Sequence, residues 1–251
     1  MYKTLSSSVN WAQGLPESGT TTLVCGDIEA DGSVLVPHFV QSGLQEGSPV
    51  VLVSLTQTMS HYMHIMRKMG VNLTKQQGFQ FVNALTPKGL DCSELPAATR
   101  PHYTVTEWAQ FFGWLNQLPA CTLIIDGLCS LLDQGYECDY VLRIVNTCQR
   151  IVEDKARGDD RARLIVTMFL DGFTEPLARS LIRRSHYFFS FEGLSSGSST
   201  EVAGRLTVVP GHLHSRLQTK SSGKFKPALL HYKISDTSVE FFSPGQSRMV
   251  L

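Results

Sequence analysis

The chain has 251 residues, of which 42% are hydrophobic and 18% are charged, a composition that is ordinary for a soluble globular protein. Its 22 basic and 22 acidic side chains cancel, which excludes a strong overall attraction to nucleic acid or to an anionic membrane. No apolar run near the N-terminus predicts a signal peptide, and no stretch of 18 apolar residues predicts a membrane span. We therefore expect a protein of the cytoplasm, and also of the nucleus.

The first part of the chain alternates short apolar runs with amphipathic stretches. In order, this pattern predicts a strand over 20–25, a helix over 33–47, a strand over 50–55, a helix capped by Ser60 and closed by Gly70, and a strand over 79–85. The run VVLVSL is continuously apolar and rich in β-branched residues, which indicates a strand buried on both faces. Pro37 lies inside a predicted helix, where its missing N–H is tolerated only near the first turn.

The alternation continues after a proline-containing interval. Residues 86–103 contain three prolines and no periodicity, so we predict a loop there. The next predicted elements are a helix over 106–118 with Trp108, Phe111, Phe112 and Leu115 as its apolar side, a strand over 121–126, an amphipathic helix over 139–155, and, after a charged connector at 157–163, the buried strand LIVTMFL.

Towards the C-terminus the pattern changes to short strands separated by loops rich in serine and glycine. The segments HYFFSFEG, RLTVVPG, LLHYKIS and TSVEFFS have no helices between them, and only parallel strands require such crossovers. We therefore predict an α/β fold, in which a mostly parallel sheet with flanking helices continues into an antiparallel C-terminal extension. The expected organisation is a flexible N-terminal extension over 1–19 and a single domain over 20–251, with a parallel core over 20–190 and an antiparallel part over 191–251.

The first strand, loop and helix have the outline of a phosphate-binding P-loop without its chemistry. In G-x-x-x-x-G-K-[ST], backbone amides surround the phosphates, lysine neutralises charge and the hydroxyl holds Mg²⁺. Here five residues separate Gly26 from Gly32, Ser33 stands where lysine belongs, and the loop carries the acids Asp27, Glu29 and Asp31. One charge pair at about 4 Å contributes roughly 4 kcal/mol at an effective dielectric of 20. The loss of the lysine's attraction and the repulsion from up to three acids would together exceed the ~8 kcal/mol with which a micromolar ligand binds. We therefore predict no intrinsic nucleotide binding and no cofactor.

The stretch TLIID keeps the outline of a Walker-B strand. Its acid, Asp126, stands at the strand end where a Walker-B acid holds Mg²⁺. A buried strand that ends in a turn acid before Gly127 has the same pattern, and the sequence does not separate the two interpretations. An active ATPase with an atypical phosphate loop therefore stays open as the alternative hypothesis.

Other patterns for catalysis or metal binding are incomplete. The stretch GLSSG matches the G-x-S-x-G nucleophile motif, but no helix is predicted after Ser195 and no histidine follows Asp236. His61 and His64 share a predicted helix without a third ligand nearby, and none of the six cysteines forms a C-x-x-C pair. We predict no catalytic residue and no metal site.

A basic segment near the C-terminus is a candidate contact with nucleic acid. Between residues 202 and 235 there are six basic side chains and no acids. The segment RLQTKSSGKFK at 216–226 is a loop by composition, and its cations can contact phosphates with a salt-dependent affinity while Phe225 can stack on a base. A solvated hairpin loop would have the same composition. The candidate nucleic-acid contacts are Arg216, Lys220, Lys224 and Lys226.

Four stretches resemble the Elongator complex protein 6 family. They are TTLVCGDIEADGSVLVPHF, VLVSLTQTMSHYMHIMRKMGVNL, CTLIIDGLCSLL and HYKISDTSVEFFSPG. The resemblance implies a RecA-like fold that lacks functional Walker motifs, in agreement with the acidic loop. Pro37 departs from the pattern expected at the start of the first core helix.

The resemblance also implies partners. It implies assembly with Elongator complex proteins 4 and 5 into a heterohexameric ring, which attaches to the catalytic Elongator subunits, binds tRNA and supports 5-carboxymethyl-type modification of wobble uridines. The ring of the family is ATP-responsive, but no motif of this sequence supplies a catalytic residue. Within such a ring the basic loop would contact tRNA.

Overall fold

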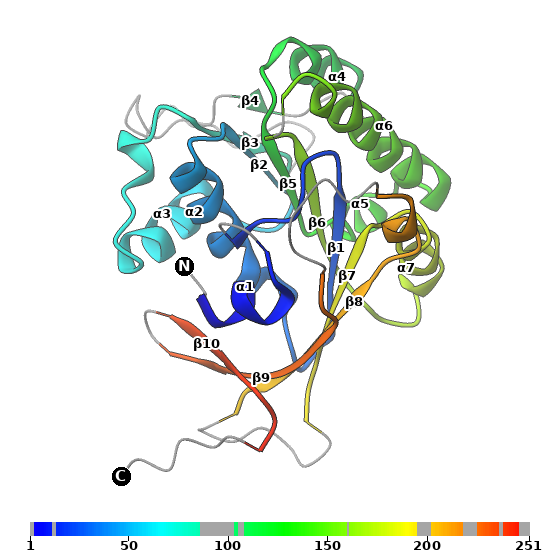
Figure 1. Ribbon diagram of the computed structural model, residues 1–251. Coiled ribbons are helices and arrows are strands. Elements are labelled where there is room, and N and C mark those ends of the chain that lie inside the picture. Colours follow the sequence, from blue (N-terminus) through cyan, green and yellow to red (C-terminus); the bar gives the residue numbers. More distant parts are fainter. Residues whose placement is uncertain are drawn as a thin grey trace.

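One sheet of ten strands organises the structure, a computed structural model that describes residues 3–11, 14–85, 103–104, 108–159, 161–194, 202–217, 225–235 and 238–245 (Figure 1). The strands are ordered β10-β9-β8-β7-β1-β6-β5-β2-β3-β4. Their bounds are β1 Thr21–Gly26, β2 Val50–Ser54, β3 Phe79–Asn83, β4 Tyr103–Thr104, β5 Thr122–Asp126, β6 Arg163–Phe169, β7 Tyr187–Glu192, β8 Gly204–Pro210, β9 Ala228–Ile234 and β10 Val239–Phe242.

The sheet is parallel in its centre and antiparallel towards the C-terminus. β1 pairs in parallel with β6 and β7, and the parallel pairing continues through β5, β2, β3 and β4. β8, β9 and β10 then add to β7 in antiparallel fashion. Every residue of β1, β2 and β5 is buried, as continuous apolar runs predict for strands covered on both faces. The predicted fold class is confirmed.

Helices cover the two faces of this sheet (Figure 1). α1 Lys3–Val9, α2 Val36–Glu46 and α3 Met59–Lys68 pack with one hydrophobic cluster, whereas α4 Trp108–Gln117, α5 Ser130–Asp133, α6 Cys138–Ala156 and α7 Glu175–Ile182 pack with the other. The described residues also contain the short 3-10 turns η2 Gly32–Leu35, η3 Leu73–Lys75 and η5 His214–Arg216. None of the helices in the described ranges is long and apolar enough to cross a membrane.

The helix starts differ in detail from the predictions. Residues 32–35 form the 3-10 turn η2, so α2 begins later than expected and Pro37 falls in its first turn, where no backbone N–H donor is needed. α3 begins at Met59 after Thr58, which makes the prediction of Ser60 as its N-cap wrong. Gly70 does end the segment, with a positive φ of 81° that favours glycine.

The N-terminal segment, for which a flexible extension over residues 1–19 was predicted, packs on the core in its described part. In its described part, α1 buries Leu5 and Val9 completely in the hydrophobic core. Trp11 follows, and its ring packs edge-on against that of Tyr187 at 5.2 Å between centroids. Only two apolar side chains mark α1, too few to give a helical period.

Some elements were not predicted or lie outside the described residues. α5 and α7 are short helices that were not predicted, and α7 provides the crossover between β6 and β7. The loop predicted over 86–103 lies outside the described residues except for Tyr103, which begins β4.

Candidate functional site

The degenerate phosphate loop and Asp126 lie at the same edge of the sheet. The parallel strands β1, β6, β5 and β2 place their carboxyl ends side by side, which is where open α/β sheets bind ligands. Gly26 ends β1 and Asp126 ends β5. Asp31 is close enough to Asp126 for its charge to act on the Asp126 carboxyl.

The acidic side chains of the loop accept hydrogen bonds from the loop's own amides. The Ser33 N–H donates to Asp31 Oδ1 at 2.8 Å, and the Ser33 hydroxyl donates to Asp31 Oδ2 at 2.5 Å. The Glu29 N–H donates to Asp27 Oδ1 at 2.9 Å. Asp31 thus caps the N-terminus of η2, the position at which a P-loop binds phosphate.

The interior of the loop is filled by its own backbone. The Asp27 N–H donates to the Ala30 carbonyl at 3.0 Å, and the Ala30 N–H donates back to the Asp27 carbonyl at 3.2 Å. A Cβ built on Gly26 would overlap the Ala30 carbonyl oxygen and the Gly32 nitrogen. Gly26 is therefore required for a close approach of the chain to itself.

Asp126 is buried beneath this loop among hydroxyl groups. Only 1% of its surface is exposed. Its Oδ1 accepts from the Thr167 hydroxyl at 2.5 Å, and its Oδ2 accepts from the hydroxyls of Tyr62 and, at 3.3 Å, Thr56. The pKa of Asp126 is raised because burial disfavours the charged carboxylate, and the bonds from Thr167 and Tyr62 act in the opposite direction.

A cavity of about 320 Å³ opens beside these residues. Its lining comes from Asp31 and Ser33, from Asp126 and α3, and from residues 234–235 and 238–239 at the adjoining ends of β9 and β10. Its apolar wall consists of Val34, Pro37, Ile65, Met69, Ile234 and Val239. The cavity reaches the lower end of the size range of small-molecule sites.

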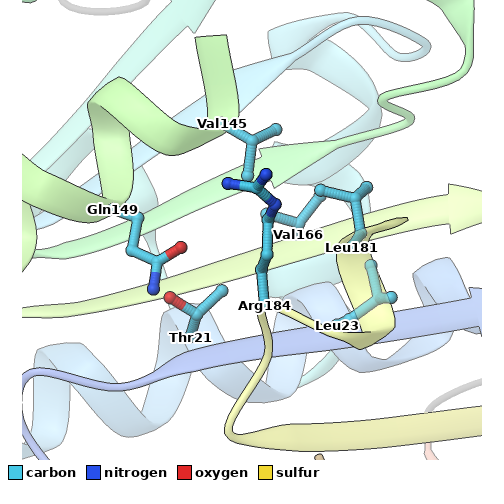
Figure 2. Close-up of a pocket in the computed structure, with 7 residues that line it drawn as sticks. All are labelled: Thr21, Leu23, Val145, Gln149, Val166, Leu181 and Arg184. Carbon is cyan, nitrogen blue, oxygen red and sulfur yellow. The ribbon is translucent and has the colours of Figure 1, made fainter. Parts of the chain in front are cut away.

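A second gap, between β1 and helices α6 and α7, is far smaller. Figure 2 shows the side chains around it, among them Thr21, Gln149 and Arg184. Its volume of about 10 Å³ is close to the space needed for one water molecule. A substrate does not fit there.

The basic loop is described only at its two ends. Arg216 in η5 and Lys226 are exposed, whereas Lys220 and Lys224 lie outside the described residues. The Phe225 ring packs against Tyr187 at 4.9 Å between centroids. Phe225 therefore anchors the end of the loop in the structure, and its stacking on a base stays a prediction.

The other candidate sites gain no support. His61 packs edge-on against Tyr62 at the rim of the large cavity, and His64 is exposed on α3. Within the described residues, no three His, Cys, Asp or Glu side chains are grouped as metal ligands. Ser195 lies outside the described residues.

Comparison with known proteins decides the family. The model of the family described as Elongation complex protein 6 matches residues 2–93. Elongator complex protein 6 of Xenopus laevis is 30% identical, and the alignment covers 100% of both chains. The chain belongs to the Elongator complex protein 6 family. The human member is 28% identical, again over 100% of both chains.

A solved structure supports the fold of this Elongator complex protein 6 family member. A KaiC-like protein from Pyrococcus horikoshii is 14% identical, covers 94% of both chains and superposes with a TM-score of 0.58. At this identity the likeness shows the fold alone. The predicted RecA-like fold is confirmed.

Two groups of residues at this edge were missed by sequence reasoning. The hydroxyls around Asp126 come from the ends of β2, α3 and β6, and only the strand order brings them together. The loops after β1 and β6 also expose large apolar side chains, with 89% of Ile28 and 72% of Phe173 accessible. Ile28 was recognisable as the one large apolar residue in GDIEADGS, although the sequence does not show that it points outward.

Proposed function

We propose that the chain is a non-catalytic subunit of the Elongator accessory ring. It assembles with Elongator complex proteins 4 and 5 into a heterohexamer, in the cytoplasm and nucleus, and supports tRNA binding and wobble-uridine modification. Its membership of the Elongator complex protein 6 family over the full length supports the assignment to Elongator. The observation that carries the non-catalytic role is the Asp31 carboxylate at the N-terminus of η2.

A phosphate and the Asp31 carboxylate would compete for the same backbone donor, the Ser33 N–H. A phosphate would have to displace Asp31 from the Ser33 N–H while it approached the carboxylates of Asp27 and Glu29. Each such repulsion at about 4 Å costs roughly 4 kcal/mol at an effective dielectric of 20, before screening by solvent. The loop offers no lysine in return, so triphosphate binding is disfavoured.

Ring assembly would use the same edge of the sheet. Phe169 at the end of β6 pairs in register with Gly26, so Ile28 and Phe173 stand on adjacent loops. Apolar side chains of this size in one place are typical of a protein interface. We propose a neighbouring ring subunit as their partner, with basic residues that face Asp27 and Glu29.

The test is assembly under native conditions. The full chain is mixed with Elongator complex proteins 4 and 5, and the product is weighed by native mass spectrometry. We expect a heterohexamer with two copies of each chain. The result that overturns the proposal is a chain that stays outside every complex with these two proteins.

An active ATPase is the second candidate, because Asp126 lines the 320 Å³ cavity together with Ser33. Mg²⁺ would require this carboxylate to give up hydroxyl donors and to carry full charge in a buried position. Equilibrium binding of labelled ATP and Mg²⁺ to the isolated chain separates the candidates. We expect a dissociation constant weaker than about 1 mM, whereas micromolar binding that Asp126→Asn abolishes would establish the ATPase.

A further inference from the structure

Two arginines stand beside the predicted basic loop at the opposite edge of the sheet. Arg183 and Arg184 follow α7 directly, and both are exposed. The turn after β8 packs at the same place, because the Leu213 N–H donates to the Ser185 carbonyl at 2.9 Å. A Cβ on Gly211 would overlap Ser185, so the two backbones are in close contact.

Two cations of the basic loop, Arg216 and Lys226, lie close to this contact in the fold. Arg216 lies one 3-10 turn beyond Leu213, since its N–H donates to the Leu213 carbonyl at 2.9 Å. At the other end of the loop, the Phe225 ring lies 5.3 Å from that of His214 in η5. Lys226 follows and is exposed. Segments far apart in the sequence thus bring four exposed cations to one edge.

The charge at this edge is not cancelled locally. Neither 176–191 nor 202–235 contains an acid, and within the described part of the chain no ion pair involves Arg183, Arg184 or Arg216. Arg184 donates to the Asn146 amide oxygen at 2.9 Å, a neutral partner that leaves its charge in place.

Three acids in the described residues lie near this edge: Glu17, Glu153, which accepts from Gln149 at 2.8 Å, and Asp159, which pairs with Arg161. Glu17 accepts a hydrogen bond from the Tyr187 hydroxyl, and Tyr187 packs against His214. None of these three carboxylates forms an ion pair with Arg183, Arg184 or Arg216 in the described residues. The edge therefore presents unpaired cations although the whole chain is neutral.

We infer that Arg183 and Arg184 form one phosphate-binding surface with Arg216 and Lys226, and that this surface holds the backbone of an RNA. The identity of the RNA as tRNA rests on the proposed function. Guanidinium groups bind phosphate with two parallel hydrogen bonds, and contacts of this kind position a nucleic acid without reading its sequence. Binding at this surface is therefore independent of RNA sequence and weakens as salt is added.

The test measures tRNA binding by the complete complex with Elongator complex proteins 4 and 5. The variant carries Arg183→Gln and Arg184→Gln, and unfractionated tRNA is titrated over a range of salt concentrations. Each lost contact should reduce the slope of log affinity against log salt by about 0.7–0.9. At about 0.1 M salt this corresponds to a five- to eightfold loss of affinity per contact.

A matched control removes the same charge elsewhere. Arg67 at the end of α3 and Lys75 in η3 are exposed on the face of the sheet opposite α7, and Arg67→Gln with Lys75→Gln should leave affinity and slope unchanged. Arg183→Lys with Arg184→Lys should keep the slope. Arg184→Gln alone, which removes one charge and should reduce the slope by one contact, serves as the second variant if the glutamine pair fails to assemble.

The outcomes separate the inference from the proposed function. If the glutamine pair binds tRNA with unchanged affinity and slope, or loses no more than the control, the arginines do not belong to the surface. If charge reversal of Lys220, Lys224 and Lys226 still weakens binding in that case, the proposed tRNA role survives without them. If the unaltered complex does not bind tRNA, the proposed tRNA role fails as well.

Discussion

Two histidines are buried in the neutral form and connect pH to stability. The His38 ring bonds to the Gly14 carbonyl at 3.0 Å, and His186 Nδ1 accepts from the Thr21 N–H at 3.0 Å. Burial lowers the pKa of His38 to about 3 and that of His186 to about 4. The unfolded chain takes up these protons near pH 6.5, whereas the folded chain does not until lower pH. The stability that they contribute is therefore complete above pH 6.5 and is lost as the pH falls towards 4.

We predict that the free energy of unfolding falls between pH 6.5 and pH 4 by up to about 1.4 kcal/mol per pH unit for each of these histidines. Urea unfolding followed by circular dichroism at pH 7.5, 6 and 5 measures the slope. His186→Gln should remove the contribution of one histidine to the slope of the unfolding free energy against pH. His64→Gln changes an exposed position on α3 and should leave this slope unchanged. A stability that does not vary over this range contradicts the prediction.

The close backbone approach at Gly26 can be tested by a single substitution. Gly26→Ala places a Cβ against the Ala30 carbonyl and the Gly32 nitrogen, and crowding of this kind costs about 1–3 kcal/mol of stability. Gly113 in α4 has open space around its Cβ position, so Gly113→Ala should instead gain about 0.5–1 kcal/mol from helix propensity. Thermal unfolding of both variants checks the prediction, and a similar effect of the two substitutions would count against the closed loop.

Among the elements, α1 joins the N-terminus to the core although it is only seven residues long. Isolated helices of this length do not form in water, so its stability comes from Leu5, Val9 and the contact of Trp11 with Tyr187.

We predict that Leu5→Ala lowers the free energy of unfolding by about 2–5 kcal/mol, as truncation of a fully buried leucine does. Ser7→Ala, at an exposed position of the same helix, should change it by less than about 0.5 kcal/mol. Chemical denaturation of the two variants measures both changes in the free energy of unfolding. Equal stabilities would mean that α1 does not pack on the sheet.

How well each element was predicted follows from its own residues. Strands such as 50–55 and 121–126 are continuous apolar runs, so their position and burial were evident. α1 was missed because KTLSSSV carries only two apolar residues. Ser60 was predicted as a cap although Thr58, two residues earlier, is also a residue type that caps helices. The hydroxyls of Tyr62 and Thr167 meet Asp126 only through the strand order, which a single sequence does not contain.

On the scale of the whole molecule, the carboxyl edge of the sheet combines a closed phosphate loop with exposed apolar side chains. Burial of Ile28 and Phe173 against a neighbouring subunit would contribute roughly 1.5–3 kcal/mol for each side chain. The acids Asp27 and Glu29 beside them would select a basic neighbour.

We predict that Ile28→Asp with Phe173→Asp prevents assembly with Elongator complex proteins 4 and 5, because two charges would be buried at the contact. Leu229→Asp changes an exposed apolar residue on β9, where 48% of the side chain is accessible, and should leave assembly intact. Native mass spectrometry of both mixtures gives the answer, provided that circular dichroism shows both chains folded. Assembly of the double variant would place the interface elsewhere.

The position of β1 in the sheet has a consequence for synthesis on the ribosome. β1 is the first strand to be made, yet its neighbours are β6 and β7, which follow only in the second half of the chain. At translation rates of about 5–20 residues per second, both edges of an apolar strand wait on the order of ten seconds for their partners. The nascent chain therefore needs shielding from other polypeptides during that interval, and a slower ribosome lengthens the exposure.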